Sequence, residues 1–150
     1  MLRNIPDVIS PELLKILHEM GHGDELVIAD GNFPAARLAS RLVRCDGHQA
    51  SDLLKAILTL FPVDTFVEKP ITLMQVVDDK TEVVDDKTEM EPEMWNVYKG
   101  ILKKLDVEPN QINYEERFTF YEKAKAAYAI VATSEKALYG NIILKKGVLS

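Results

Sequence analysis

The chain contains one cysteine, Cys45, and therefore cannot form a disulfide within itself. Because disulfides belong mainly to oxidising compartments, a lone cysteine is typical of a cytoplasmic protein. Apolar runs are short, and none approaches the ~20 residues that cross a bilayer. The opening residues, MLRNIPDVIS, also lack the uninterrupted apolar stretch of a secretory signal. We therefore expect a cytoplasmic protein that does not bind membranes.

Several sequence signatures of chemistry are missing as well. There is no cluster of cysteines and no EF-hand loop, so we expect no metal site. Neither a G-x-G-x-x-G fingerprint nor a Walker loop is present, which argues against the ordinary nucleotide cofactors. No G-x-S-x-G elbow marks a serine hydrolase. Any activity of this chain should thus require no cofactor.

Negative charge is concentrated in one segment. Residues 76–89 read VVDDKTE twice in tandem, and each copy carries three acidic residues against one lysine, so the pair contributes −4 of the net charge of −6. The rest of the chain is nearly neutral and has no basic stripe for a phosphate backbone, which disfavours nucleic-acid binding. Two such short copies cannot form a solenoid, whose repeats span roughly 20–50 residues. We interpret the segment as an acidic surface insertion; the alternative is an acidic ligand site.

Helical and extended patterns alternate along the chain. Ser10, Pro11 and Glu12 are typical of a helix start, and Gly21 of its end. The continuously apolar run at 25–30, ELVIAD, indicates a strand buried on both faces. A short helical segment should follow GNFP. Further strands are expected at 41–46, 71–77, 111–116, 129–133 and 141–148, and further helices at 51–61, 91–106 and 118–128. At 150 residues, this alternation predicts a single α/β domain with a central, mainly parallel sheet flanked by helices.

Two residues flank the buried strand at 25–29 and could carry chemistry. Asp30 ends the strand, and ligands of parallel α/β sheets bind beyond the carboxyl ends of strands. His22 stands between two glycines before the strand, and imidazole exchanges protons near neutral pH. The alternatives are a helix-end histidine and a loop-starting aspartate. Because an extended strand of this length covers ~16 Å, a site that uses both residues favours an interface between subunits.

The C-terminal third offers further polar candidates. Arg117 could pair with a carboxylate or bridge sugar hydroxyls through its fixed fork of donors. Phe118, Tyr121 and Tyr128 surround it in sequence, with core packing as their simpler role. The triplet 139–141, Tyr-Gly-Asn, comes directly before the last strand. It fits an ordinary turn, and alternatively it offers a hydroxyl and an amide to a polyhydroxylated ligand.

Taken in order, these segments resemble the L-fucose mutarotase and D-ribose pyranase family (RbsD/FucU), and more closely its fucose branch. The matching fragments are ISPELLKIL, EMGHGDE, NFPA, SDLL, RFTFYEKA and YGNIILKKGV, and they span almost the whole chain. The resemblance implies an RbsD-like α/β subunit in a decameric ring, with sites between adjacent subunits. It also implies a free monosaccharide as ligand, most closely L-fucose.

The resemblance assigns roles to individual residues. The family's proton-donating histidine corresponds to His22 and its sugar-binding aspartate to Asp30. Arg117 stands where the ribose branch usually has histidine, which favours the fucose branch. Tyr139, Gly140 and Asn141 match the sugar-contacting triplet, and Tyr139 is the expected partner of His22 in proton transfer. Two departures are present: Gly31 replaces the usual alanine after the aspartate, and Ser134 the usual glycine before the glutamate.

The function that follows is interconversion of the α and β anomers of L-fucose by acid/base-catalysed ring opening and closure. Two alternatives stay open. A D-ribose pyranase would use the same groups to interconvert pyranose and furanose rings. A ring protein that binds sugar without catalysis would share the fold and the binding residues. A phosphosugar isomerase is disfavoured because no glycine-rich helix start or cationic cluster offers a phosphate cradle.

Overall fold

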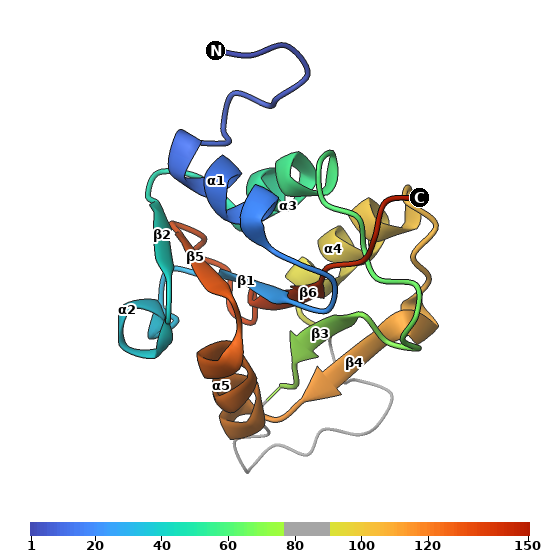
Figure 1. Ribbon diagram of the computed structural model, residues 1–150. Helices are drawn as coiled ribbons and strands as arrows, with labels where there is room; N and C mark the ends of the chain where they lie inside the picture. The colour runs from blue at the N-terminus through green and yellow to red at the C-terminus, as the bar shows by residue number, and fades with distance from the viewer. Residues whose placement is uncertain (77–90) are drawn as a thin grey trace.

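The computed structural model describes residues 1–76 and 91–150 (Figure 1). The predicted acidic insertion lies, except for Val76, outside the described residues. Five α-helices, one short 3₁₀ helix (η1, Pro109–Gln111) and six strands are described; the α-helices are α1 (Pro11–Glu19), α2 (Ala35–Leu38), α3 (Ala50–Leu58), α4 (Glu93–Lys103) and α5 (Arg117–Ala126). The strands are β1 (Glu25–Ala29), β2 (Leu42–Cys45), β3 (Ile71–Met74), β4 (Ile112–Glu115), β5 (Ala129–Thr133) and β6 (Ile142–Lys145).

The strands form one sheet in the order β2-β5-β1-β6-β3-β4. Strands β1 to β5 all run in the same direction, and β6 alone runs antiparallel to its neighbours β1 and β3. The predicted α/β fold with a central, mainly parallel sheet is therefore confirmed. The reversed strand has a simple cause. Only residues 134–141 separate β5 from β6, and a parallel return needs a crossover of about a dozen residues or more.

Helices cover both faces of the sheet (Figure 1). Helices α1, α3 and α4 pack on one face and bury a cluster that includes Leu13, Leu53 and Tyr98. Helices α2 and α5 pack on the other face, where Phe120 and Phe33 meet side chains of β1 and β6. Strand β1 is buried between the two layers from Leu26 onward. The continuous apolar run of this strand is explained by its position in the middle of the sheet.

Helix boundaries follow the local chemistry with small differences from the prediction. Ser10 caps α1, and its side chain accepts a hydrogen bond from the Leu13 backbone N–H at 3.1 Å. The helix ends at Glu19, two residues before the predicted Gly21. Helix α4 ends at Lys103, so Leu105, which lies within the predicted helix at 91–106, follows the helix and is 46% exposed. Within the described ranges, no helix is long and apolar enough to span a bilayer.

The direction of the strands gives the sheet two distinct ends. We call the end at which β1–β5 finish and β6 begins the carboxyl edge, and the opposite end the amino edge. Asp30 and Asn141 lie at the carboxyl edge, because Asp30 follows β1 and Asn141 precedes the reversed β6. His22 precedes β1 and lies at the amino edge. The two ends therefore carry separate groups of the predicted site residues.

Candidate functional site

Two hydrogen bonds hold Asp30 in place at the carboxyl edge, one from its backbone N–H and one to its carboxylate. Its backbone N–H donates to the Asn141 side-chain oxygen at 2.7 Å, and its carboxylate accepts from the Asn32 N–H at 3.0 Å. The residue is 7% exposed. Burial raises the pKa of Asp30 above its usual value, although hydrogen bonds from the Asn32, Gly140 and Phe33 backbones and from the Asn141 side chain oppose the shift. The structure thus joins two predicted residues that are 111 positions apart.

The triplet 139–141 leads into β6 through a strained backbone. Tyr139 has a φ of 60°, a left-handed backbone conformation that residues other than glycine rarely adopt. Strain of this kind costs energy and concentrates at functional sites. Tyr139 is half-buried against the cluster formed by α2, α5 and the sheet, whereas Asn141 is 4% exposed. The structure thus has a turn at residues 138–139, as the triplet suggested, in a segment that packs tightly beside Asp30.

Arg117 begins α5, directly after the carboxyl end of β4. Its Nε donates to the Tyr121 hydroxyl at 3.2 Å. The Tyr121 ring packs edge-on against Phe33, with centroids 5.3 Å apart, and so connects Arg117 to the loop after Asp30. Phe118 is 65% exposed and Phe120 is fully buried. Core packing is therefore wrong for Phe118, whereas Tyr121 and Tyr128 are partly buried and pack against the two core clusters.

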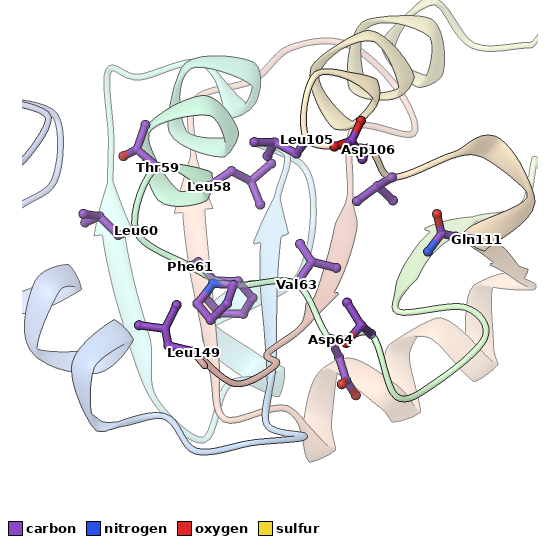
Figure 2. Close-up of a pocket in the computed structure, with 13 residues that line it drawn as sticks. Leu58, Thr59, Leu60, Phe61, Val63, Asp64, Leu105, Asp106, Gln111 and Leu149 are labelled. Carbon is purple, nitrogen blue, oxygen red and sulfur yellow. The ribbon is translucent and has the colours of Figure 1, made fainter.

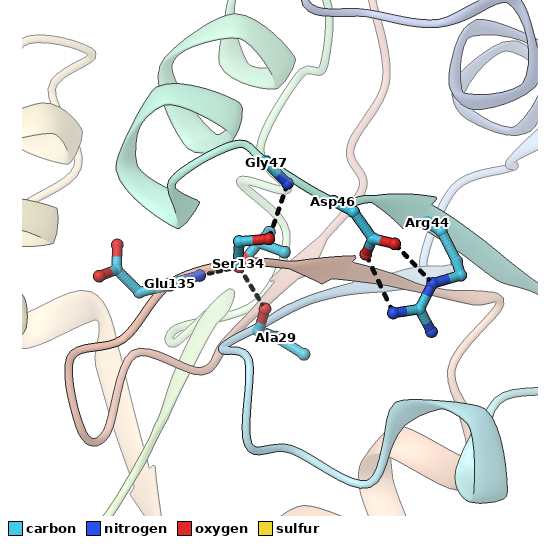
Figure 3. A network of polar contacts seen from close by, with 7 residues as sticks. Ala29, Arg44, Asp46, Gly47, Ser134 and Glu135 are labelled. Carbon is cyan, nitrogen blue, oxygen red and sulfur yellow. Dashed lines mark hydrogen bonds and ion pairs between the residues drawn. The ribbon is translucent and has the colours of Figure 1, made fainter.

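Hydrogen bonds tie the neighbouring strand ends together (Figure 3). The Thr133 hydroxyl donates to the Ala29 carbonyl at 2.7 Å and accepts from the Glu135 N–H at 3.2 Å. Ser134 accepts from the Gly47 N–H at 2.7 Å, which links β5 to the loop after β2. These contacts fix the backbone from which Asp30 projects, because Ala29 is the residue before it.

The two departures from the family pattern lie next to each other in space. A Cβ at Gly31 would stand 3.1 Å from the Glu135 carbonyl and 3.8 Å from the backbone of Ser134. A methyl group at position 31 would therefore lie against the backbone of residues 133–135. The Ser134 hydroxyl accepts from the Gly47 N–H and takes no part in the hydrogen bond between Asp30 and Asn141.

At the amino edge, His22 contacts an aspartate that the sequence analysis did not single out. His22 Nε2 lies 3.1 Å from Asp64 Oδ1, and the ring packs edge-on against Phe66 with centroids 5.0 Å apart. The His22 side chain is 42% exposed, whereas that of Asp64 is 3% exposed. Burial alone would raise the pKa of Asp64, but the Phe66 N–H and the His22 imidazole outweigh it, so the pKa of Asp64 is lowered. No local pattern in the sequence signals a partner 42 residues away.

A close backbone contact holds Asp64 in position. The Asp64 N–H donates to the Lys145 carbonyl at 3.0 Å, and the Gly147 N–H donates to the Pro62 carbonyl at 2.8 Å. A Cβ at Gly147 would lie 2.8 Å from the Asp64 Cα, closer than real side chains approach. Glycine at 147 is thus required for the segment that carries Asp64 to reach the end of β6.

Residues 18–22 read HEMGH, which has the spacing of a zinc-binding helix. That motif needs both histidines on one helical face, but α1 ends at Glu19 and Met20 is extended, with φ −62° and ψ 138°. The two imidazoles therefore do not share a helical face. Across residues 1–76 and 91–150, no group of three or more His, Cys, Asp or Glu side chains is placed to hold a metal ion.

A cavity of about 430 Å³ opens at the amino edge (Figure 2). Its walls are mainly apolar, and Asp64 lies at its rim. Asp30, Arg117, Tyr139 and Asn141 do not line it. Among the candidate residues and their contacts, the cavity is lined by Asp64, which contacts His22.

Within one chain, the structure brings Asp30 and Asn141 together, places Arg117 and Tyr139 at the same edge, and leaves His22 at the other. The five residues of β1 separate His22 from Asp30, a span of ~16 Å in extended backbone. The expected separation of these two residues along one strand is thus confirmed. The chain thus carries two candidate half-sites, an imidazole at the amino edge and hydrogen-bonding groups at the carboxyl edge.

Comparison with known proteins identifies the family to which this chain belongs. The model of the RbsD / FucU transport protein family matches residues 3–149. An L-fucose mutarotase of Actinobacillus pleuropneumoniae is 46% identical over 148 residues, covering 99% of this chain and 97% of that protein. A fucose mutarotase of Mus musculus is 46% identical over 151 residues, covering 99% and 95%. The crystal structure of the Streptococcus pneumoniae fucose mutarotase in complex with L-fucose superposes with a TM-score of 0.89 at 46% identity, covering 99% of this chain and 100% of that one. The chain therefore belongs to the RbsD / FucU family.

Proposed function

We propose that this protein is an L-fucose mutarotase, a carbohydrate isomerase that interconverts the α and β anomers of the free sugar. The observation that carries the proposal is the full-length match to a fucose mutarotase bound to L-fucose, with a TM-score of 0.89 at 46% identity. The two half-sites provide the chemistry that this reaction needs.

Mutarotation requires two proton transfers and no redox step. The C1–O5 bond of the sugar breaks as O5 gains a proton and the anomeric hydroxyl loses one, which gives the open aldehyde. Rotation about C1–C2 presents the other aldehyde face, and closure reverses both transfers. Each well-placed acid or base contributes typically ~10²–10⁴-fold to such a step.

His22 is the proposed principal acid/base. Its contact with Asp64 defines which ring nitrogen is available, because the lowered pKa of Asp64 keeps that carboxylate ionised and able only to accept. Nε2 of the neutral ring then carries the proton that is donated to Asp64. Nδ1 is left as the basic nitrogen, on a side chain that is 42% exposed. Asp64 orients the ring and stabilises the imidazolium that forms during the reaction.

The carboxyl edge is the proposed sugar-binding half-site. Asp30, Arg117 and Asn141 bind the sugar hydroxyls, Gly140 allows close approach of the backbone, and Tyr139 is the partner for the second proton transfer. An uncharged sugar forms hydrogen bonds without neutralising a charge, so binding should change little with salt.

A complete site on this proposal needs two chains. The imidazole of one subunit and the carboxyl edge of its neighbour enclose one sugar, in a homo-oligomer that we propose to be a decameric ring in the cytoplasm. The separation of the half-sites along β1 supports this arrangement. Neither membranes nor nucleic acids are proposed as partners.

The test is anomer exchange measured by NMR saturation transfer on L-fucose and, in parallel, on D-ribose. We expect the protein to accelerate exchange of L-fucose anomers well above the rate in buffer and to act more weakly on D-ribose. Faster pyranose–furanose exchange of ribose would instead support the pyranase. Binding of L-fucose with exchange at the buffer rate would contradict catalysis and support a sugar-binding protein.

A further inference from the structure

Tyr98 lies on α4, far in sequence from the triplet 139–141, and contacts that triplet directly. Its hydroxyl donates to the Gly140 carbonyl at 2.5 Å, across 42 positions of sequence. The side chain is fully buried. Burial, together with the nearby carboxylates of Glu135 and Asp30, raises the pKa of Tyr98, so the phenol stays protonated and remains a donor.

The Gly140 backbone is confined on several sides. A Cβ on this residue would stand 3.3 Å from the Ala137 carbonyl, 3.3 Å from the Glu135 side chain and 3.4 Å from the Asp30 Cβ. Its N–H faces the Asp30 carboxylate and acts to lower the pKa of that group. The Tyr98 hydroxyl is therefore the contact that fixes the other side of the residue, the peptide group that joins Gly140 to Asn141.

This contact acts on both neighbours of Gly140. Asn141 must keep its side-chain oxygen on the Asp30 N–H, at 2.7 Å, and Tyr139 must stay at a φ of 60°, which its side chain disfavours. If the Gly140 carbonyl turned, Asn141 would shift and Tyr139 would be free to leave its strained conformation. Buried carbonyls strongly favour a partner, so the hydroxyl holds the triplet in one arrangement.

We infer that Tyr98 is a positioning residue for the reaction, which holds Gly140 and thereby places the Tyr139 hydroxyl and the Asn141 amide for the sugar. The expected effect on the exchange rate rests on the proposed function. The expected effect on the structure of the triplet 139–141 rests only on the Tyr98–Gly140 contact. Tyr98 acts through the triplet and does not itself contact sugar.

The test variant is Tyr98→Phe, which removes one oxygen and keeps the ring. We expect the exchange rate at saturating L-fucose to fall by between about tenfold and a hundredfold, because misplaced catalytic groups lose rate at this scale. The half-saturating sugar concentration should rise by a smaller factor. Hydrogen–deuterium exchange of a peptide covering residues 136–141 should become faster.

Two controls separate positioning from a general loss of stability. Tyr128→Phe removes a hydroxyl that contacts Glu19 at 3.3 Å near the amino edge. Ile57→Val removes one methylene from the buried face of α3 and lowers stability without touching the triplet. Both should keep wild-type kinetics, measured well below the melting temperature of each variant.

The outcomes distinguish this inference from the proposed function. Wild-type kinetics in Tyr98→Phe, or unchanged deuterium uptake in residues 136–141, would overturn the positioning role. The positioning role would also be overturned if Ile57→Val, at the same stability as Tyr98→Phe, slowed exchange by the same factor. If the wild-type protein fails to accelerate exchange, the proposed function fails. The positioning role is then supported by faster deuterium uptake together with weaker L-fucose binding in Tyr98→Phe, and overturned if either is unchanged.

Discussion

Replacing His22 with alanine is expected to reduce the exchange of L-fucose anomers by ~10²–10⁴-fold, the contribution of one well-placed acid/base group. Asp64 cannot take this role, because the Phe66 N–H and His22 lower its pKa and keep its carboxylate ionised near neutral pH. The side chain is 42% exposed, so its loss leaves no cavity in the core and should change stability little. NMR saturation transfer measures the rate.

The matched control is His18→Ala. His18 lies four residues earlier, in the exposed last turn of α1, and its removal should leave exchange at the wild-type rate. Sugar binding should persist in His22→Ala, because the hydrogen-bonding groups lie at the carboxyl edge. Exchange in His22→Ala at the wild-type rate, in an intact assembly, would show that the imidazole does not transfer the proton.

Replacing Asp30 with asparagine is expected to reduce exchange by about 10- to 150-fold, since a hydrogen bond to a charged group contributes about 1.5–3 kcal/mol. Asparagine keeps an oxygen that can accept from the Asn32 N–H, so the loop after β1 should stay in place. The loss should therefore come from weaker sugar binding and from poorer orientation of the bound sugar. Titration with L-fucose, combined with the exchange rate at saturation, separates these two effects.

The same substitution should not destabilise the fold at pH 7. Burial raises the pKa of Asp30 above 3.8, so the folded protein binds this proton more tightly than the unfolded chain does. Above the raised pKa, the buried charge destabilises the wild type relative to Asp30→Asn. As pH falls through that pKa towards 3.8, the carboxyl becomes neutral and the difference between the two proteins should disappear. Urea unfolding at several pH values measures it.

Asp46→Asn is the control for Asp30→Asn. Asp46 follows β2 at the same edge, but its side chain is 62% exposed and paired with Arg44 (Figure 3). Its replacement should leave both exchange and the pH dependence of stability unchanged. An equal loss of exchange in the two variants would mean that Asp30 acts only through the general charge of this edge.

The elements that local chemistry determines were predictable from the sequence. The Ser10 cap, the buried run of β1 and the strand at 129–133 each follow from residue type and spacing, and the alternation of helices and strands predicted the parallel sheet. The opposite placement of His22 and Asp30 also followed, because a strand of known length lies between them. The reversal of β6 follows from the short connection after β5, and the predicted strands at 129–133 and 141–148 already left too few residues for a parallel return.

Contacts between distant segments could not be predicted in this way. Asp64 reaches His22 because Gly147 lets residues 62–64 approach the end of β6, and a sequence pattern does not show that approach. Tyr98 falls within the predicted helix at 91–106, but helical periodicity does not distinguish a buried tyrosine with a hydrogen-bond partner from a buried phenylalanine. For both His22 and Tyr98, the local structure around the residue was predictable. The distant group that the polar atom of each ring contacts was not.

Mixing two inactive variants tests the central claim that one sugar is held between two chains. His22→Ala and Asp30→Asn, co-expressed with different tags and purified through both, form mixed assemblies in which neighbouring half-sites combine at random. We expect exchange to recover to about a quarter of the wild-type rate, because about a quarter of the interfaces then pair an intact His22 with an intact Asp30. Mixed assemblies that exchange L-fucose no faster than their inactive parents would contradict a site shared between subunits.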